Sequence, residues 1–302
     1  MKRTPIAIGL VAALIVGAVV VWWRGGIVAW LPVDLQYAHC LALDGQWQRA
    51  RQCTDPLSRS VATVRAWRTE RAYRAFLQRH PDHVGARIMY GNFLADNGRD
   101  DEAAQQWLSV VKSHPHVAVA HNNLGEYWLH RGEIARAFAF FDRARQLDPQ
   151  GAVYQYNWAN AVFAYRNDAK KVYGWNTDEI TAHSLEAFRK ARDLDPHDFT
   201  YANAYAEMFY FTPEANWEEA YEAWLFCLRQ NLDEPTRQRI YARLARVCMH
   251  LKRFDEAAEW LGKMTLPEVA SYRDALERKR IALLKGAPDN SPSLRMMRAV
   301  RD

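Results

Sequence analysis

Four cysteines are the side chains with the most reactive chemistry in this 302-residue chain. Two interpretations are open for Cys40 and Cys53. If they face each other across a short helical hairpin, they form a disulfide in an oxidising compartment. If they stay reduced, they are two small buried apolar groups. Cys227 and Cys248 fall at apolar positions of successive predicted helices, which favours burial in the core.

Two pairs of histidines have the close spacing of metal ligands. Each pair flanks a proline, which is typical of a turn between helices: His80 and His83 around Pro81, and His114 and His116 around Pro115. No cysteine or carboxylate set lies near either pair at ligand spacing, so solvated turn histidines are favoured over a metal site.

Sequence motifs for catalysis are missing. The chain lacks the phosphate-binding loop, the dinucleotide-binding glycine pattern, the nucleophile elbow and the zinc-protease helix. Pairs of carboxylates fall in turns or in early turns of helices, where acidic residues suit the helix dipole: Asp100, Asp101, Glu218 and Glu219. We therefore predict no enzymatic activity, no cofactor and no metal.

The charge balance argues against nucleic-acid binding. The chain has 40 Lys and Arg against 35 Asp and Glu, a formal charge of +5. Three of these cations, Lys2, Arg3 and Arg24, flank the first apolar run. The remainder of the chain has 37 basic residues against 35 acidic ones, a formal charge of +2. A body of charge +2 has no excess to neutralise phosphates.

Residues 6–23 form an 18-residue run without a charged side chain. As a helix it spans roughly 27 Å, close to the hydrocarbon thickness of a bilayer, and Trp22, Trp23 and Arg24 sit where interfacial anchors belong. The sequence favours an uncleaved single-span membrane anchor over a cleaved signal peptide that would release the chain to the periplasm. Because two of the three flanking cations precede the run, we expect a cytoplasmic amino terminus and a periplasmic or otherwise extracytoplasmic body.

A repeat of 34 residues decides the predicted architecture. Side chains of the same size class recur 34 residues apart in two successive segments. The first segment has Tyr90-Gly91, Leu94, Gly98, Ala103, Trp107, Val110 and Pro115, and the second has Leu124-Gly125, Trp128, Gly132, Ala137, Phe141, Ala144 and Pro149. Gly91 lets two helices approach closely, and Gly98 and Gly132 end first helices. This pattern resembles the tetratricopeptide repeat, whose unit is two antiparallel helices.

The resemblance implies an all-α fold: a right-handed superhelical solenoid of antiparallel helix pairs, preceded by one transmembrane helix. No strand alternation appears. The predicted segments are a membrane anchor at 1–30, a diverged helical repeat region at 31–83, about five repeats at 84–265, a capping helix at 266–285 and a flexible tail at 286–302. The third repeat carries an insertion at 166–181.

In tetratricopeptide arrays the first helix of each unit lines the concave surface, and this implies a partner-binding groove. Its candidate residues are Asn92, Asn122, Asn123, Glu126, Tyr156, Asn157, Asn160, Asn203, Tyr210, Arg239, Arg243 and Arg246. Asn123 and Asn157 lie one period apart, which resembles the asparagine ladder by which some members hold peptide backbones. The alternative is that these residues cap turns or face solvent. The lysines of the clamp for carboxyl-terminal tails are not found.

The insertion is expected to be a loop between the two helices of the third repeat, and it carries four candidate interface residues, Lys170, Lys171, Tyr173 and Trp175. Aromatic rings beside cations suit a protein interface. The alternative is that the insertion packs against the adjacent helices, with Trp175 buried, and has no role in an interface.

These observations predict a non-enzymatic, membrane-anchored interaction protein that binds peptide or protein partners in its groove. Such a protein would be a scaffold or assembly factor for an envelope complex. The alternative is a regulatory or structural subunit of an enzyme complex with catalysis elsewhere. A third possibility is a structural element associated with lipid or peptidoglycan.

Overall fold

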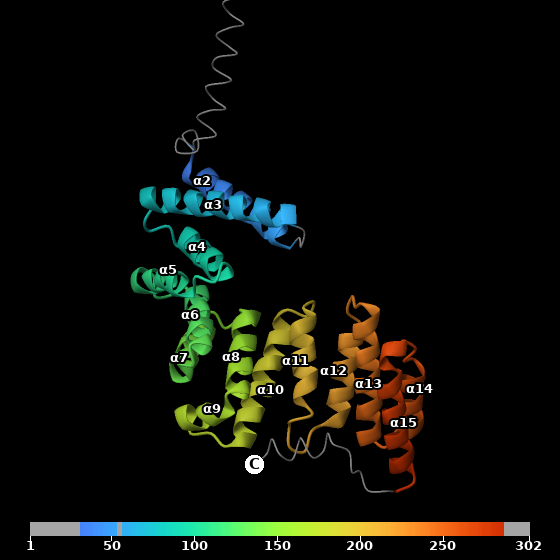
Figure 1. Cartoon of the computed structure of the whole chain (residues 1–302). Helices are drawn as coiled ribbons and strands as arrows, with labels where there is room; N and C mark the ends of the chain where they lie inside the picture. The colour runs from blue at the N-terminus through green and yellow to red at the C-terminus, as the bar shows by residue number, and fades with distance from the viewer. Residues whose placement is uncertain (1–30, 53–55, 287–302) are drawn as a thin grey trace, which may run out of the picture. The chain divides into compact units, whose positions relative to one another are not determined.

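The computed structural model describes residues 31–52 and 56–286, and within these ranges it is helical with no strand (Figure 1). The predicted anchor run 6–23 lies outside the described residues, as does the tail from 287 onward. Among the helices that are described, none combines the length and apolar character needed to cross a membrane. The chain divides into two compact units, the first ending at Tyr127 and the second beginning at Trp128.

The first unit contains two helices of the diverged region followed by the first repeat. Its helices are α2 (Val33–Arg51), α3 (Pro56–Arg79), α4 (Val84–Asp96) and α5 (Asp100–Ser113), and α6 (Ala118–His130) contains the boundary between the units. Helices α2 and α3 pack as a hairpin around the buried side chains of Cys40, Trp47, Tyr73 and Phe76.

Cys40 lies inside α2, which is one continuous helix from Val33 to Arg51, while the disulfide with Cys53 stays a prediction. Cys40 is a buried free thiol, and Cys53 lies outside the described residues.

A buried carboxylate in this hairpin makes the stability of the first unit pH-dependent. The Tyr73 hydroxyl donates to Asp44 Oδ2 at 2.9 Å, while Asp44 Oδ1 is buried without a partner. Burial raises the pKa of Asp44 although the Tyr73 hydrogen bond opposes this. The folded chain therefore binds a proton at Asp44 more readily than the unfolded chain does.

We expect the contribution of Asp44 to the free energy of unfolding to rise as the pH falls from 7, and to level off below the ordinary aspartate pKa of about 4. Unfolding of the native chain and of Asp44→Asn, measured between pH 4 and 7, checks this: the free energy of unfolding of the native chain, relative to that of the variant, should fall as the pH rises. The exposed Asp82→Asn is the matched control. A parallel pair of curves for Asp44→Asn and the native chain would contradict the expectation.

The predicted helix pairing of the first repeat is confirmed. Helix α4 ends at Asp96, and Gly98 takes the left-handed conformation (φ +72°) that a residue with a Cβ rarely adopts. Helices α4 and α5 then pack closely because Gly91 has no side chain. A Cβ placed there would lie 2.8 Å from Trp107 Cδ1 and 2.9 Å from Cε2.

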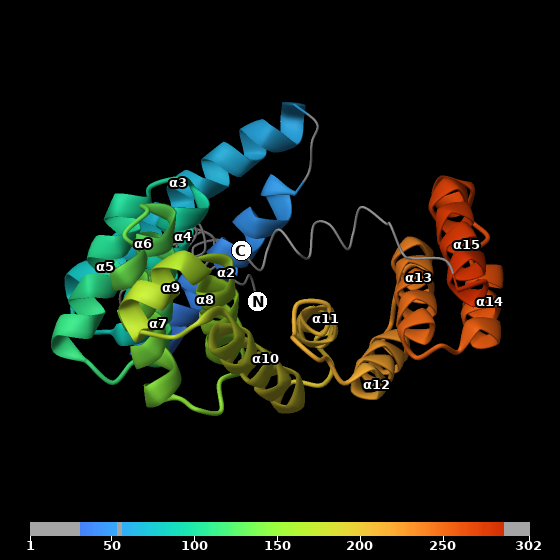
Figure 2. The same cartoon turned by 90° about the horizontal axis from the view of Figure 1, so that it is seen from below.

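The second unit stacks further helix pairs. Its elements are α7 (Ile134–Leu147), α8 (Ala152–Ala164), α9 (Arg166–Tyr173), α10 (Thr177–Leu194), α11 (Phe199–Met208), α12 (Trp217–Leu228), α13 (Glu234–His250), α14 (Phe254–Gly262), a 3-10 turn (Pro267–Val269) and α15 (Ala270–Leu284). Figure 2 shows α8, α11 and α13 along one side of this unit and α10, α12 and α14 along the other. We call the first set the first-helix layer.

The insertion at 166–181 is not a loop. Its first half is the helix α9, which ends at Gly174 in the left-handed conformation (φ +73°). Its second half begins α10, because Asn176 and Glu179 form a reciprocal capping box at the helix start. The second helix of this pair is therefore long, and α9 packs against α7, α8 and α10.

Candidate protein-binding surface

Aromatic contacts join the helices of the first-helix layer. The rings of Tyr156 and Tyr201 lie 5.2 Å apart between α8 and α11, and those of Phe163 and Phe211 lie 5.1 Å apart near the opposite ends of these helices. These pairs fix α11 beside α8, so that polar residues between them are presented on a rigid support.

Three predicted groove asparagines lie on these two helices. Asn160 is exposed at the end of α8, while Asn157 and Asn203 are half-buried. All three are positioned by helices rather than by loops, which limits the conformational entropy that a partner must remove.

Tyr210, Glu207, Arg243 and Arg246 form one cluster at the end of α11, which we call the arginine–tyrosine cluster. Arg243 Nη2 pairs with Glu207 Oε1 at 2.7 Å, and the Tyr210 hydroxyl donates to the Arg243 carbonyl at 3.2 Å. The Arg246 guanidinium lies 4.4 Å from the centre of the Tyr210 ring. The structure thus brings together three residues, on α13 and after α11, that the sequence placed in the groove.

The cluster carries more positive than negative charge. Burial raises the pKa of Glu207, although Arg243 and Arg246 lower it in part. Within the described chain, the carboxylate at ion-pair distance from Arg243 is Glu207, and none stands at that distance from Arg246. Arg239, one turn before Arg243 on α13, is exposed and donates to the Thr236 hydroxyl at 2.7 Å. The three arginines are therefore suited to an anionic group of a partner.

Two predicted groove residues are buried, so their assignment to an open surface is wrong. Asn122 is 5% exposed and Tyr210 is 6% exposed. Helix α6 is covered on more than one side, since residues 120–122 and 124–125 are all buried. Tyr210 lies beyond the end of α11, where Trp217, Trp224 and the two arginines enclose its ring.

Asn123, whose counterpart one period later is Asn157, is hydrogen-bonded within the first unit. The side-chain amides of Asn123 and Asn92 are hydrogen-bonded at 2.8 Å and link α6 to α4. Glu126, on the next turn of α6, is exposed. Asn157 belongs to the second unit, so the ladder of Asn123 and Asn157 stays a prediction.

The aromatic residues of the insertion pack onto the second unit. The Tyr173 hydroxyl donates to Asp142 Oδ2 at 2.8 Å and accepts from Trp158 Nε1 at 3.3 Å. Trp175 stacks on Tyr173 at 4.4 Å. These contacts favour the packed alternative for both rings, which are half-buried.

The two lysines of the insertion lie beside this packed surface. Lys171 is exposed and pairs with Asp168 at 3.3 Å, and Lys170 is half-buried. Their use in an interface stays a prediction.

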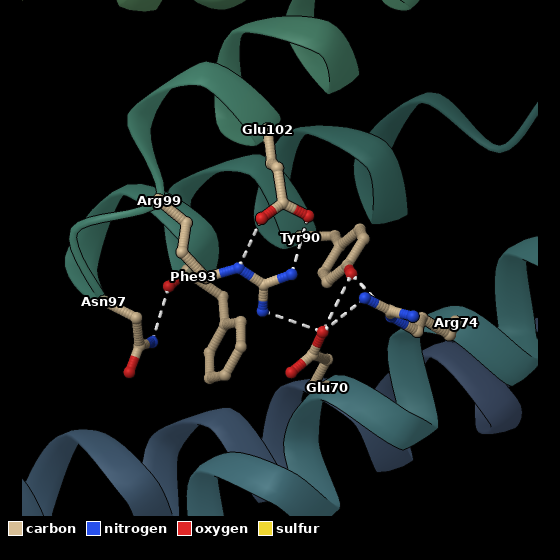
Figure 3. Close-up of polar contacts among 7 residues, drawn as sticks. All are labelled: Glu70, Arg74, Tyr90, Phe93, Asn97, Arg99 and Glu102. Carbon is tan, nitrogen blue, oxygen red and sulfur yellow. Dashed lines mark hydrogen bonds and ion pairs between the residues drawn. The ribbon is translucent and has the colours of Figure 1, made fainter.

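Sequence reasoning missed a polar network that joins α3 to α4 and α5 (Figure 3). Arg99 donates to both carboxylate oxygens of Glu102, at 2.7 and 2.6 Å, and pairs with Glu70 at 2.8 Å. Arg74 pairs with Glu70 at 2.7 Å and donates to the Tyr90 hydroxyl at 3.0 Å. Burial alone raises the pKa of Glu70, but Arg99 and Arg74 together hold it below its usual value.

This network ties the diverged region to the first repeat. Glu70 and Arg99 are 29 residues apart. No local pattern pairs residues at that separation. The clearest sequence signal was the arginine content of residues 56–79.

The three cysteine thiols of the described residues are buried. Burial raises the pKa of the Cys40 thiol to about 11, and those of Cys227 and Cys248 to about 12. Thiols with such pKa values are protonated at neutral pH and are poor nucleophiles. Across residues 31–52 and 56–286, no three histidine, cysteine or carboxylate side chains gather as a metal site. His83 instead caps α4 by accepting from the Ala86 N–H at 3.1 Å.

Comparison with known proteins identifies the repeat. The family model of the tetratricopeptide repeat matches residues 70–115 and 106–152. The solved structure of YrrB, described as a TPR protein with an unusual peptide-binding site, is 12% identical with a TM-score of 0.50. It covers 71% of this chain and 97% of its own. The structure from the functional characterization of Pseudomonas aeruginosa pilF is 15% identical with a TM-score of 0.51, covering 85% of this chain and 97% of its own.

No curated protein sequence matches this chain. At these identities the two structures show a shared fold. The two matched ranges contain the second half of α3 and the helices α4 to α7. The chain therefore contains tetratricopeptide repeats, and its described part is an all-helical stack of the kind that these repeats build.

Proposed function

We propose that this chain is a non-enzymatic interaction protein that holds an extended segment of a protein partner on its first-helix layer. Tetratricopeptide proteins mediate protein–protein interaction, and a stack of helix pairs offers a long surface without a preformed reaction centre. The likeness to a protein with a peptide-binding site supports the same use. We propose that residues 6–23 anchor the chain in the membrane and that the body acts outside the cytoplasm as a scaffold or assembly factor.

The arginine–tyrosine cluster carries this proposal. Arg243 and Arg246 lie over aromatic rings, which orders their guanidinium groups before a partner arrives. Arg239 extends the positive charge along α13 toward solvent. The partner segment fitted by this arrangement has an acidic side chain or a terminal carboxylate, because a guanidinium binds a carboxylate through two parallel hydrogen bonds.

Replacing Arg239 and Arg246 by glutamate should reduce partner recovery at least about tenfold, since an unpaired or repelled charge in an interface costs about 2 kcal/mol or more. The measurement is crosslinking in intact cells, with a photoreactive residue at Asn160 of the full-length chain, followed by quantification of the crosslinked partner. Arg143→Glu with Arg229→Glu is the matched control, because both arginines are exposed elsewhere on the second unit. Equal recovery from both double variants would contradict the proposed surface.

The membrane part of the proposal has its own measurement. The intact chain should resist extraction by alkaline carbonate, and its body should be degraded by protease added to cells whose outer barrier is opened while the inner membrane stays closed. A body protected under those conditions would place it in the cytoplasm and contradict the expected orientation.

A further inference from the structure

The solvent side of α3 carries an unusual concentration of apolar surface. Val61, Val64 and Trp67 follow one another at a spacing of three residues, so they lie along one stripe of the helix. Their exposed fractions are 37%, 53% and 59%. Repeat proteins normally need a polar outer face on their terminal helices to stay soluble, so this stripe calls for something that covers it.

The same stripe continues into positive charge. Arg68 and Arg71 are exposed on the next turn, and the Arg71 guanidinium lies 5.4 Å from the centre of the Trp67 ring. The sequence of α3 holds six arginines and one glutamate, a formal charge of +5 within 24 residues. That glutamate, Glu70, is held in the network with Arg74 and Arg99, so it does not offset Arg68 or Arg71. We call Val61, Val64, Trp67, Arg68 and Arg71 the α3 outer face.

The residues of the α3 outer face are of the types that proteins place at the boundary between lipid headgroups and hydrocarbon. A helix that lies in that plane buries aliphatic and tryptophan side chains among acyl chains and extends arginines toward anionic phosphates. Tryptophan is enriched at this depth because its ring is apolar while its N–H needs a polar partner. Each arginine near an anionic surface adds an attraction that anionic lipid strengthens and salt weakens.

The chain itself brings this face close to a bilayer. The uncharged run ends at residue 23, and α2 begins at Val33, ten residues later. A fully extended segment of ten residues reaches at most about 36 Å. If residues 6–23 span the membrane as proposed, the α2–α3 hairpin stays within that distance of the headgroups, where its local concentration favours weak binding.

We propose that the α3 outer face is a second membrane contact, which lies on the surface of an anionic bilayer beside the anchor. This inference rests on the proposed membrane anchoring for its geometry, but it predicts binding that survives when the anchor is disabled. It makes α3 the element that fixes the first unit against the membrane, while the second unit carries the partner-binding surface.

Flotation with lipid vesicles tests the contact in the full-length chain. Leu10→Asp with Leu14→Asp disables the apolar run, because each charge opposes insertion at the centre of a span. In this background we expect flotation with vesicles of phosphatidylcholine containing phosphatidylglycerol, and little flotation with phosphatidylcholine alone. Adding Val64→Glu and Trp67→Glu should lower the partition coefficient at least about tenfold.

Matched controls separate this face from general charge. Leu108→Glu with Val153→Glu changes the net charge equally at exposed apolar positions of other helices and should leave flotation unchanged. Arg68→Gln with Arg71→Gln should lower the partition coefficient by about fivefold per arginine. Lys112→Gln with Arg143→Gln, also exposed, should not.

The failures of the two membrane proposals can be told apart. If the intact chain is extracted by carbonate while the anchor-disabled chain still floats through α3, the anchor fails and the α3 contact stands. If flotation is the same with and without the α3 substitutions, the α3 contact is overturned. If those substitutions abolish self-association or recovery of an acidic protein but not flotation, the face binds protein and the proposal is also overturned.

Discussion

Replacing Gly91 by alanine should lower the free energy of unfolding of the first unit by about 2–3 kcal/mol, because overpacking a tight core costs amounts of this order. The new Cβ would lie 2.8 Å from Trp107 Cδ1, closer than real contacts allow. The indole has little room to retreat, since it is 5% exposed and its Nε1 donates to the Ile88 carbonyl at 3.5 Å. Helices α4 and α5 must therefore separate.

Hydrogen exchange of peptides from α4 and α5 is the suitable measurement, because repeat arrays often lose two-state behaviour. Gly45→Ala is the matched control in the same unit. Gly45 lies inside α2, and a Cβ there meets Arg49 Nη1 at an ordinary 3.6 Å. That change should be stabilising by about 0.5–1 kcal/mol, since alanine is the better helix former. Similar exchange in the two variants would show that the close approach at Gly91 is unimportant.

Replacing Trp224 by alanine should destabilise the second unit by about 3–5 kcal/mol. Its side chain is 1% exposed, so removing it leaves a cavity among buried neighbours of α11, α12 and α13. The guanidinium of Arg243 lies 5.8 Å from the centre of the indole, and Tyr210 packs at 6.4 Å. Loss of the indole should therefore also loosen the arginine–tyrosine cluster and reduce partner recovery without touching the partner.

The variant Trp224→Phe distinguishes the effect of lost side-chain volume from the effect of a lost indole hydrogen bond. The indole Nε1 is buried without a partner, so phenylalanine sacrifices no hydrogen bond and keeps much of the volume. We expect a loss below about 1.5 kcal/mol for this variant. Hydrogen exchange of α11 and α12, together with the crosslinking yield, gives both readouts. A phenylalanine variant as unstable as the alanine variant would mean that the indole N–H has a partner, such as a bound water.

The repeat was readable from local pattern. A period of 34 residues places glycine and alanine where helices meet, and the positive φ angles of Gly98 and Gly132 match the predicted helix ends. The start of α10 was equally readable in principle, because Asn176 and Glu179 have the spacing of a capping box. The insertion was expected as a loop because its residues lie outside the period.

The partner-binding surface could be predicted only in part from the sequence. A helical wheel gives the direction of each side chain, but it does not say how many sides of the helix are covered. Asn122 was therefore placed in the groove, although α6 is buried around much of its circumference. Tyr210 was misplaced for a related reason, since arginines from α13 cover its ring.

The spacing of residues along the chain was enough to predict a helical fold with paired helices and a tetratricopeptide-like repeat, because all three depend on patterns within a few tens of residues. Which polar residues contact one another became known from the packing of the helices. Glu70 meets Arg99, Asn92 meets Asn123 and Glu207 meets Arg243 across neighbouring helices. Such pairings depend on how helices pack and join residues that are distant in the chain. The spacing of residues along the sequence carries no information about that packing.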